Sequence, residues 1–258
     1  MFKDQSIAIT GAAGGIGCAI AQMFVAQGAK VAISDVKAPL STGKEIGAAA
    51  FACDVGNESD VTAFIAAAEA KNGPIDIFVA NAGVGFGDPH HAAGASNEAW
   101  ETSWAVNVMG AVYASRALLP AMKARGSGRL VIIASAAGLL NQVGSASYSA
   151  TKHAAVGFAE ALAIRHWDQG IKTHCVCPQY VRTNMTKDMT FAENSPDGMI
   201  EPADVALSLK QAIEEDRFMV LPHNVVGKYF KNKGEDYQSY ITGLNKLKQM
   251  FGNDTLPQ

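Results

Sequence analysis

The sequence has few of the features that mark metal, redox or disulfide-bonded proteins. It holds only four cysteines, which are Cys18, Cys53, Cys175 and Cys177, and no two of them form a C-x-x-C pair. The adjacent His90 and His91 lie in a stretch predicted to be a loop, where we expect them at the surface. We therefore expect no metal site, and free thiols in a reducing, cytoplasmic setting.

Long runs of one character are also lacking. The net charge is −3, no stripe of Lys or Arg is present, and no run of 18 apolar residues occurs. The first five residues carry no basic segment followed by an apolar core. These absences argue against nucleic acid or a membrane as partners of this chain, and against a secretory signal in it. With 48% hydrophobic and 17% charged residues and no low-complexity linker, the composition predicts one globular domain over residues 1–258.

What the chain does have is an alternation of short apolar runs with longer helical patterns. The apolar runs are nearly continuous, which is typical of parallel strands that are covered on both faces. Repeated strand–helix units predict an α/β, doubly wound sheet with right-handed crossovers. The predicted strands are 6–9, 30–34, 50–53, 75–80, 129–134, 172–176 and 217–221, and the predicted helices are 15–27, 58–71, 98–125, 149–169 and 202–215.

Two segments fall outside this alternation. Residues 183–199 form an irregular insertion that contains Met185, Met189 and Phe191 among polar residues. We expect it to be a substrate lid that is mobile without ligand, or else a rigid surface segment. Residues 223–258 form a C-terminal extension with one predicted helix over 235–251 and a frayed polar tail.

The first predicted strand runs into a glycine-rich turn and then a helix. Such a turn lets the backbone approach a pyrophosphate, and the helix N-terminus offers unpaired N–H groups and a positive dipole. Its position in the first βα unit makes it a dinucleotide site rather than a packing turn alone. The predicted cofactor residues of the turn are Gly11, Gly14, Gly15, Ile16 and Gly17.

Asp35 ends the second predicted strand, 18 residues after Gly17. A carboxylate at this place accepts hydrogen bonds from both ribose hydroxyls of an adenosine and repels a 2′-phosphate. No arginine adjoins Asp35, and Lys37 is the only nearby cation. The sequence therefore predicts NAD rather than NADP.

Further motifs follow in a recognisable order, and together they resemble the short-chain dehydrogenase/reductase superfamily over roughly residues 5–222. The resemblance implies a single Rossmann-type domain with a seven-stranded parallel sheet in the order 3-2-1-4-5-6-7 and helices on both faces. It also implies adenine contacts from Asp54 and Val55, and a further cofactor contact from Asn81. The motifs are Asp54-Val55, Asn81-Ala82-Gly83, Asn107, Ser135 and Tyr148-Ser-Ala-Thr-Lys152.

One position departs from the family pattern, which usually has Pro-Gly after the sixth strand. Here Pro178 is followed by Gln179, so a side chain stands in the wall of the pocket where the family often has none. By resemblance, Val181 and Thr183 still hold the nicotinamide carboxamide.

The resemblance implies that Tyr148 is the catalytic base or acid. A free phenol titrates near ~10, too high for a base at neutral pH. Lys152 lies four residues later on the same helical face, and its charge favours the phenolate. Ser135 ends the fifth predicted strand and should bind the substrate oxygen. By resemblance, Lys152 also binds the nicotinamide ribose, and Asn107 holds a water that links Lys152 to solvent.

Three other functions remain open on this fold. An enoyl reductase of the same superfamily reduces C=C bonds, but it typically lacks the serine and spaces Tyr and Lys more widely. A non-catalytic NAD-sensing or scaffold protein generally loses the Tyr or the Lys. A sugar-nucleotide epimerase or dehydratase needs a longer C-terminal domain than this chain has.

The predicted substrate is a small-molecule secondary alcohol or ketone, medium-sized and hydrophobic. Its predicted contacts are Ser135, Gln142, Tyr148, Tyr180 and Met185. Small residues along 149–169 and the apolar 98–125 helix further suggest, with the family resemblance, a homodimer or homotetramer.

Overall fold

The central feature of the computed structural model is one parallel sheet of seven strands in the order β3-β2-β1-β4-β5-β6-β7, as the resemblance implied. The structure describes residues 2–88, 90–187, 189, 195 and 197–251. Because the strands are parallel, their carboxyl ends all lie at one edge of the sheet, where open α/β sheets bind ligands. The strands are β1 (Ser6–Thr10), β2 (Lys30–Asp35), β3 (Ala49–Ala52), β4 (Ile77–Ala80), β5 (Gly128–Ile133), β6 (Ile171–Val176) and β7 (Met219–Val220).

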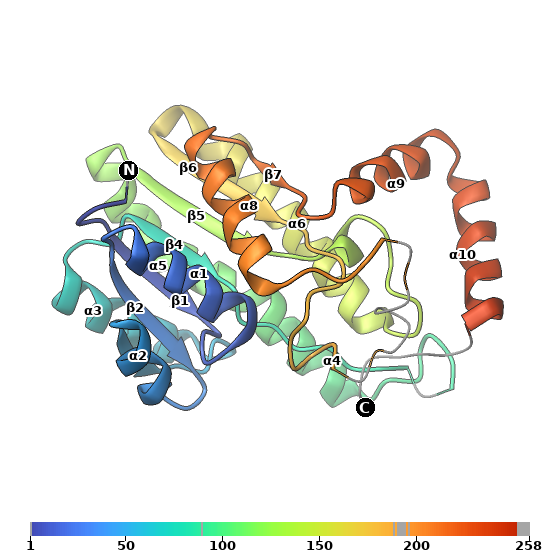
Figure 1. Ribbon diagram of the computed structural model, residues 1–258, viewed down its shortest axis with the longest axis horizontal. Helices are drawn as coiled ribbons and strands as arrows, with labels where there is room; N and C mark the ends of the chain where they lie inside the picture. The colour runs from blue at the N-terminus through green and yellow to red at the C-terminus, as the bar shows by residue number, and fades with distance from the viewer. Residues whose placement is uncertain (1, 89, 188, 190–194, 196, 252–258) are drawn as a thin grey trace.

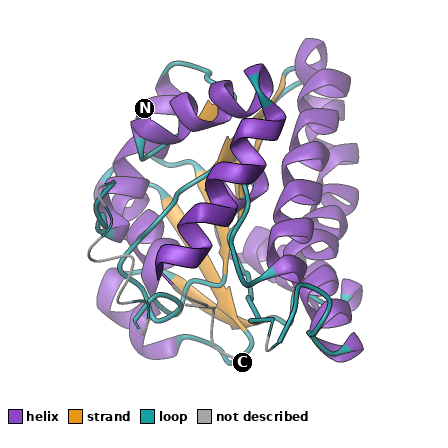
Figure 2. Cartoon of the chain, turned by 90° about the vertical axis from the view of Figure 1, so that its right-hand side faces the viewer, coloured by secondary structure: helices purple, strands orange, loops and turns teal. Residues whose placement is uncertain are grey.

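Helices cover both faces of the sheet, which stands as a single layer between them (Figure 2). Apolar residues of α1 and α8 pack on one face, and those of α3, α5 and α6 pack on the other. Such burial on both sides explains why the strand sequences are continuously apolar. The main helices are α1 (Gly15–Ala26), α2 (Leu40–Ile46), α3 (Glu58–Asn72), α4 (Asn97–Trp104), α5 (Gly110–Arg125), α6 (Ala146–His166) and α8 (Pro202–Glu214).

Several predicted boundaries were wrong. The expected helix 98–125 is interrupted by a π-helical turn, η1 (Ala105–Met109), between α4 and α5. Helix α6 begins at Ala146 rather than at residue 149, so its first turn includes Tyr148. The last strand has only two residues, and the short helix α2 was not predicted.

The C-terminal extension holds two helices rather than one. They are α9 (Asn224–Glu235) and α10 (Tyr237–Phe251), which are separated by Asp236, with φ −144° and ψ 87°. Figure 1 shows α9 leaving the sheet beyond β7 and α10 bending from it to run down the right-hand edge of the molecule. In the described part of the chain, no helix is both long and apolar enough to cross a membrane.

Candidate active site

The glycine-rich turn between β1 and α1 is built around close backbone contacts. At Gly11, whose φ is +63°, a Cβ atom would stand 2.6 Å from the Ala82 Cα. At Gly17 a Cβ would stand 2.5 Å from the Asn81 amide nitrogen. Gly15 also has a positive φ, of +55°, whereas a Cβ at Gly14 would meet nothing within 4 Å. The turn thus leaves open space at Gly14, next to the N-terminus of α1, which suits a pyrophosphate.

Asp35, at the end of β2, and Asn81, just after β4, hold this turn from the two strands that flank β1. The Asn81 amide donates to the carbonyls of Thr10 and Gly11, at 2.9 and 2.8 Å. The Asp35 carboxylate accepts from the backbone N–H groups of Ala13 and Val36, at 3.1 and 2.9 Å. A carboxylate therefore lies beside the turn at the end of β2, where a ribose of a dinucleotide would need an acceptor.

The other predicted cofactor residues lie around the same edge. Asp54 follows β3 and its carboxylate accepts from the Gly56 N–H at 2.9 Å. Val55 is buried against Gly110, the first residue of α5. Ile16 packs on the core beneath the turn. The fold thus brings Asp35 and Asp54 to adjacent strand ends, as β2 and β3 pair.

Tyr148 and Lys152 lie one turn apart on α6, under the carboxyl ends of β5 and β6. The Lys152 ammonium donates to the Ile133 carbonyl at 2.9 Å and lies 5.6 Å from the centre of the Tyr148 ring. Burial lowers the pKa of Lys152 to about 8. Burial also raises the pKa of the Tyr148 phenol, and its hydrogen bond with Ser135 opposes that rise.

Ser135 and Asn107 are both fixed by backbone groups. The Ser135 hydroxyl accepts from the Ala137 N–H at 3.1 Å and donates a long 3.5 Å bond to the Pro178 carbonyl. Asn107, in the π-helical turn, accepts from the Val84 N–H and donates to the Val84 carbonyl, both at 2.9 Å. The Asn107 amide also donates to the Thr151 hydroxyl at 3.0 Å. Asn107 therefore joins the segment after β4 to the helix that carries Lys152.

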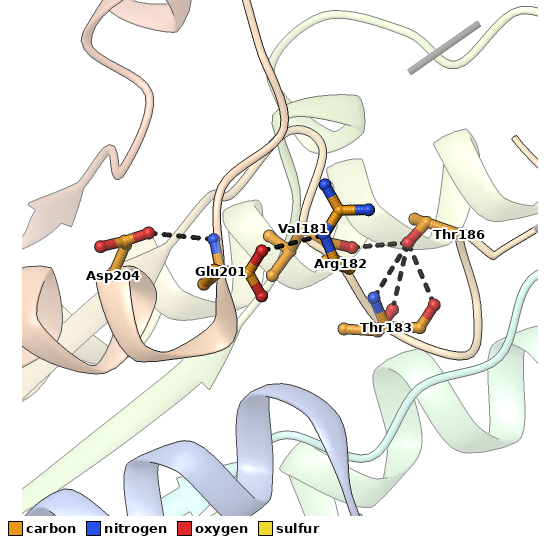
Figure 3. Close-up of polar contacts among 6 residues, drawn as sticks. All are labelled: Val181, Arg182, Thr183, Thr186, Glu201 and Asp204. Carbon is orange, nitrogen blue, oxygen red and sulfur yellow. Dashed lines mark hydrogen bonds and ion pairs between the residues drawn. The ribbon is translucent and has the colours of Figure 1, made fainter. Parts of the chain in front are cut away.

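The segment after β6 approaches the glycine turn through Thr183 (Figure 3). A Cβ at Gly15 would stand 3.2 Å from the Thr183 methyl carbon. Val181 is buried and pairs with Ile200 in a single parallel bridge. The Thr186 hydroxyl donates to the Val181 carbonyl at 2.5 Å and accepts from the Thr183 N–H at 3.1 Å. Val181 and Thr183 thus lie close to the predicted cofactor turn.

Tyr148 belongs to an apolar cluster that is centred on the buried Met189. Tyr180, Met185 and Met199 also pack against Met189. Gln142, the other predicted substrate residue, instead bonds through its backbone N–H to the Ser149 hydroxyl at 2.9 Å. Of the predicted lid, residues 188, 190–194 and 196 lie outside the described residues, and these include Phe191.

Comparison with known proteins identifies the family. The family model for short chain dehydrogenases matches residues 5–194 of this chain. The chain belongs to the short-chain dehydrogenase family.

Curated members of this family match most of the chain. The 2-(S)-hydroxypropyl-CoM dehydrogenase 3 of Xanthobacter autotrophicus is 38% identical over 206 residues, which cover 76% of this chain and 79% of that one. Oxidoreductase UcpA of Escherichia coli K12 is 32% identical and covers 100% of this chain and 97% of its own length.

Solved structures agree with the fold of this short-chain dehydrogenase. A short chain dehydrogenase/reductase from Burkholderia phymatum, in complex with NAD, has a TM-score of 0.79 at 26% identity and covers 92% of this chain and 96% of its own. The 3-ketoacyl-(acyl-carrier-protein) reductase from Brucella melitensis, complexed with NADH, has a TM-score of 0.79 at 30% identity and covers 86% and 97%.

Some residues of this dehydrogenase site had no signal in the sequence. Asp88, in the segment after β4, accepts from the Ala146 N–H at 2.8 Å and so caps the helix that carries Tyr148. Met199 joins the cluster at Tyr148, although it marked only the end of the predicted insertion. Both contacts join parts of the chain that are far apart in sequence, and no local motif predicts them.

Proposed function

We propose that this protein is an NAD-dependent oxidoreductase that interconverts a secondary alcohol and a ketone. The observation that carries the proposal is the placement of Tyr148 beside Ser135 and one helical turn from the buried Lys152. Similar proteins support an alcohol or ketone substrate. Besides the 2-(S)-hydroxypropyl-CoM dehydrogenase, they include a D-beta-hydroxybutyrate dehydrogenase of Cupriavidus necator at 28% identity and a borneol dehydrogenase of Lavandula x intermedia at 30% identity.

In this mechanism Tyr148 and Ser135 act on the substrate oxygen, and Lys152 acts through Tyr148 and the cofactor. The Tyr148 oxygen takes the hydroxyl proton during alcohol oxidation and returns it during ketone reduction. The Ser135 hydroxyl binds the same substrate oxygen and stabilises its developing negative charge. The Lys152 ammonium stabilises the phenolate and binds the nicotinamide ribose. A nicotinamide held at this site would supply the hydride chemistry.

NAD is the proposed form of the cofactor because of Asp35. Its carboxylate lies at the end of β2 beside the Ala13 backbone, and a 2′-phosphate at this place would meet negative charge. The glycine turn would hold the pyrophosphate, and Val181 and Thr183 would hold the nicotinamide. The complexes of similar proteins with NAD and NADH agree with this choice.

The apolar cluster beside Tyr148 favours a medium-sized hydrophobic substrate. Met185, Met189 and Met199 adapt to irregular apolar shapes, and Tyr180 adds an aromatic face. We therefore expect a higher kcat/KM for secondary alcohols with apolar substituents than for short polar secondary alcohols.

The test is a steady-state assay of NADH formation with a panel of secondary alcohols. Tyr148→Phe should lower turnover by about a hundredfold to ten-thousandfold while NAD still binds, because only the proton-transfer group is lost. If the variant keeps more than a tenth of wild-type turnover, Tyr148 is not the base. An NADH-binding titration of the same variant, read by fluorescence, controls for loss of the fold.

A further inference from the structure

Helix α9 of the C-terminal extension makes polar contacts that the motifs of the family do not account for. Tyr229 and Lys233 lie four residues apart and therefore point from one face of this helix. Val226 lies on the same face and is fully buried against the core that includes Leu139. This face of α9 is thus turned toward the body of the dehydrogenase.

Lys233 reaches the loop that follows β5. Its ammonium, in a side chain only 8% exposed, donates to the Leu139 carbonyl at 2.7 Å and to the Leu140 carbonyl at 3.4 Å. The ammonium nitrogen also lies 5.5 and 5.4 Å from the ring centres of Tyr237 and Tyr240. Carbonyl dipoles and aromatic faces can both compensate a buried cation.

This loop belongs to the catalytic edge of the sheet. It begins at Ser135, continues through the short helix η2 (Ala136–Gly138), and reaches Gln142 within a few residues. The Leu140 N–H also donates to the Ala136 carbonyl at 2.8 Å. A shift of the carbonyls that Lys233 binds would therefore pass to the residues next to Ser135.

Tyr229 reaches the segment between β6 and α8, which carries Tyr180 of the apolar cluster. Its hydroxyl donates to one oxygen of the Asp197 carboxylate at 2.9 Å. The other oxygen accepts from the Gln179 side-chain amide at 3.0 Å. Gln179 is the residue that departs from the family's usual glycine, and it lies next to Tyr180 in the apolar cluster.

We propose that Tyr229 and Lys233 are positioning residues, through which α9 holds the two sides of the substrate pocket and sets the affinity for the alcohol. This inference rests on the proposed function. Neither side chain acts on the reacting atoms, so their loss should weaken the binding of substrate more than it slows hydride transfer. Gln179 then has a role that the family's usual glycine could not fill, because glycine has no side chain to pair with Asp197.

The variants Tyr229→Phe, Lys233→Met and their combination test the inference. Each removes hydrogen bonds while nearly keeping the shape of the side chain. The matched control is Lys231→Met, on the same helix, because the Lys231 side chain is 74% exposed and its ion pair is with Glu235 of the same helix, at 3.7 Å. The measurements are kcat, the KM for the best alcohol, the KM for NAD, and the thermal unfolding temperature.

We expect each single variant to raise the KM for the alcohol by about threefold to tenfold, and the combination to raise it further. Turnover and the KM for NAD should stay within about twofold of the wild type, since the glycine turn and Lys152 are not touched. Lys231→Met should match the wild type in every parameter.

An unchanged KM for the alcohol in active, folded variants would overturn the inference and leave the proposed function intact. A parallel loss of turnover, NAD affinity and stability would also overturn it, because it would mean a purely structural role. Should Lys233→Met fail to fold, Tyr229→Phe alone decides. A wild type that forms no NADH with any alcohol would instead refute the proposed function itself.

Discussion

At the scale of single residues, two opposing effects act on the pKa of Tyr148. Burial raises the pKa of its phenol, whereas the hydrogen bond with Ser135 lowers it. A raised pKa keeps the phenol protonated at neutral pH, which suits an acid for ketone reduction better than a base for alcohol oxidation. A positively charged nicotinamide and the Lys152 ammonium would shift the balance toward the phenolate. We therefore expect alcohol oxidation to speed up as pH rises.

The pH profile of the Ser135→Ala variant should reveal this balance. The oxidation rate rises as Tyr148 loses its proton, and the variant lacks the bond that lowers the phenol's pKa. The midpoint of the rise in kcat/KM should therefore move to higher pH, in addition to a lower maximal rate. Ser147→Ala is the control, because the Ser147 hydroxyl makes no hydrogen bond to the described residues. A midpoint that stays in place or falls would contradict this account.

Asp35 should decide between the two nicotinamide cofactors. We expect kcat/KM with NAD to exceed that with NADP by at least about tenfold, or about 1.4 kcal/mol at the transition state. Asp35→Ala should narrow the ratio by removing both the ribose acceptor and the charge that repels a 2′-phosphate. Steady-state kinetics with each cofactor measure the ratio of the two kcat/KM values, and Asp54→Asn serves as a comparison at the neighbouring strand end. Equal efficiencies in the wild type would refute the assignment.

At the scale of elements, helix α6 depends on a cap from another segment. Its own N-cap residue, Ser145, donates its hydroxyl to the Phe86 carbonyl at 2.5 Å and makes no side-chain cap. The Asp88 carboxylate caps the helix instead, and the Asp88 N–H donates to the Gly144 carbonyl at 2.8 Å. These bonds fix the first turn, in which Tyr148 lies, against the segment after β4.

Asp88→Ala should lower the free energy of unfolding by about 1 kcal/mol, because it leaves the Ala146 N–H without its acceptor. Asp88→Asn keeps an oxygen at that position and should retain most of the stability. Urea unfolding followed by circular dichroism measures both variants. Equal stability of the alanine variant and the wild type would mean that the cap contributes nothing.

The elements that the sequence failed to predict share a physical cause. The π-helical turn around Asn107 follows from that side chain's bonds to Val84, a partner that no 3.6-residue periodicity can reveal. The first turn of α6 was missed because Ser145 and Ser147 read locally as loop residues, while its cap comes from Asp88. Helix α9 was missed because it is polar over much of its length. Its buried residues, Val226 and Lys233, lie on one face that packs on the domain.

At the scale of the whole molecule, the strand order that the family resemblance implied is confirmed, and the predicted site residues lie at the carboxyl edge of the sheet. Glycine turns and strand ends meet at one edge in any parallel sheet, so local motifs were enough to place them there. The contacts of Gln179 could not be predicted in this way. They join residues 179, 197 and 229, whose proximity depends on how the C-terminal extension packs on the finished domain.

The last prediction concerns assembly, and it starts from the outer face of α6. Ile164 is 84% exposed there, and Ala150, Gly157 and Ala161 are exposed on the same helix. A second copy of the chain packed on this face would bury apolar surface and let two helices approach closely at the small residues. We therefore expect a homodimer or homotetramer at micromolar concentration in light scattering, and Ile164→Asp should lower the measured mass. Leu207→Asp is the matched control, because Leu207 is 63% exposed on α8, on the opposite face of the sheet. A monomeric wild type, or equal effects of both substitutions, would show that α6 is not the interface.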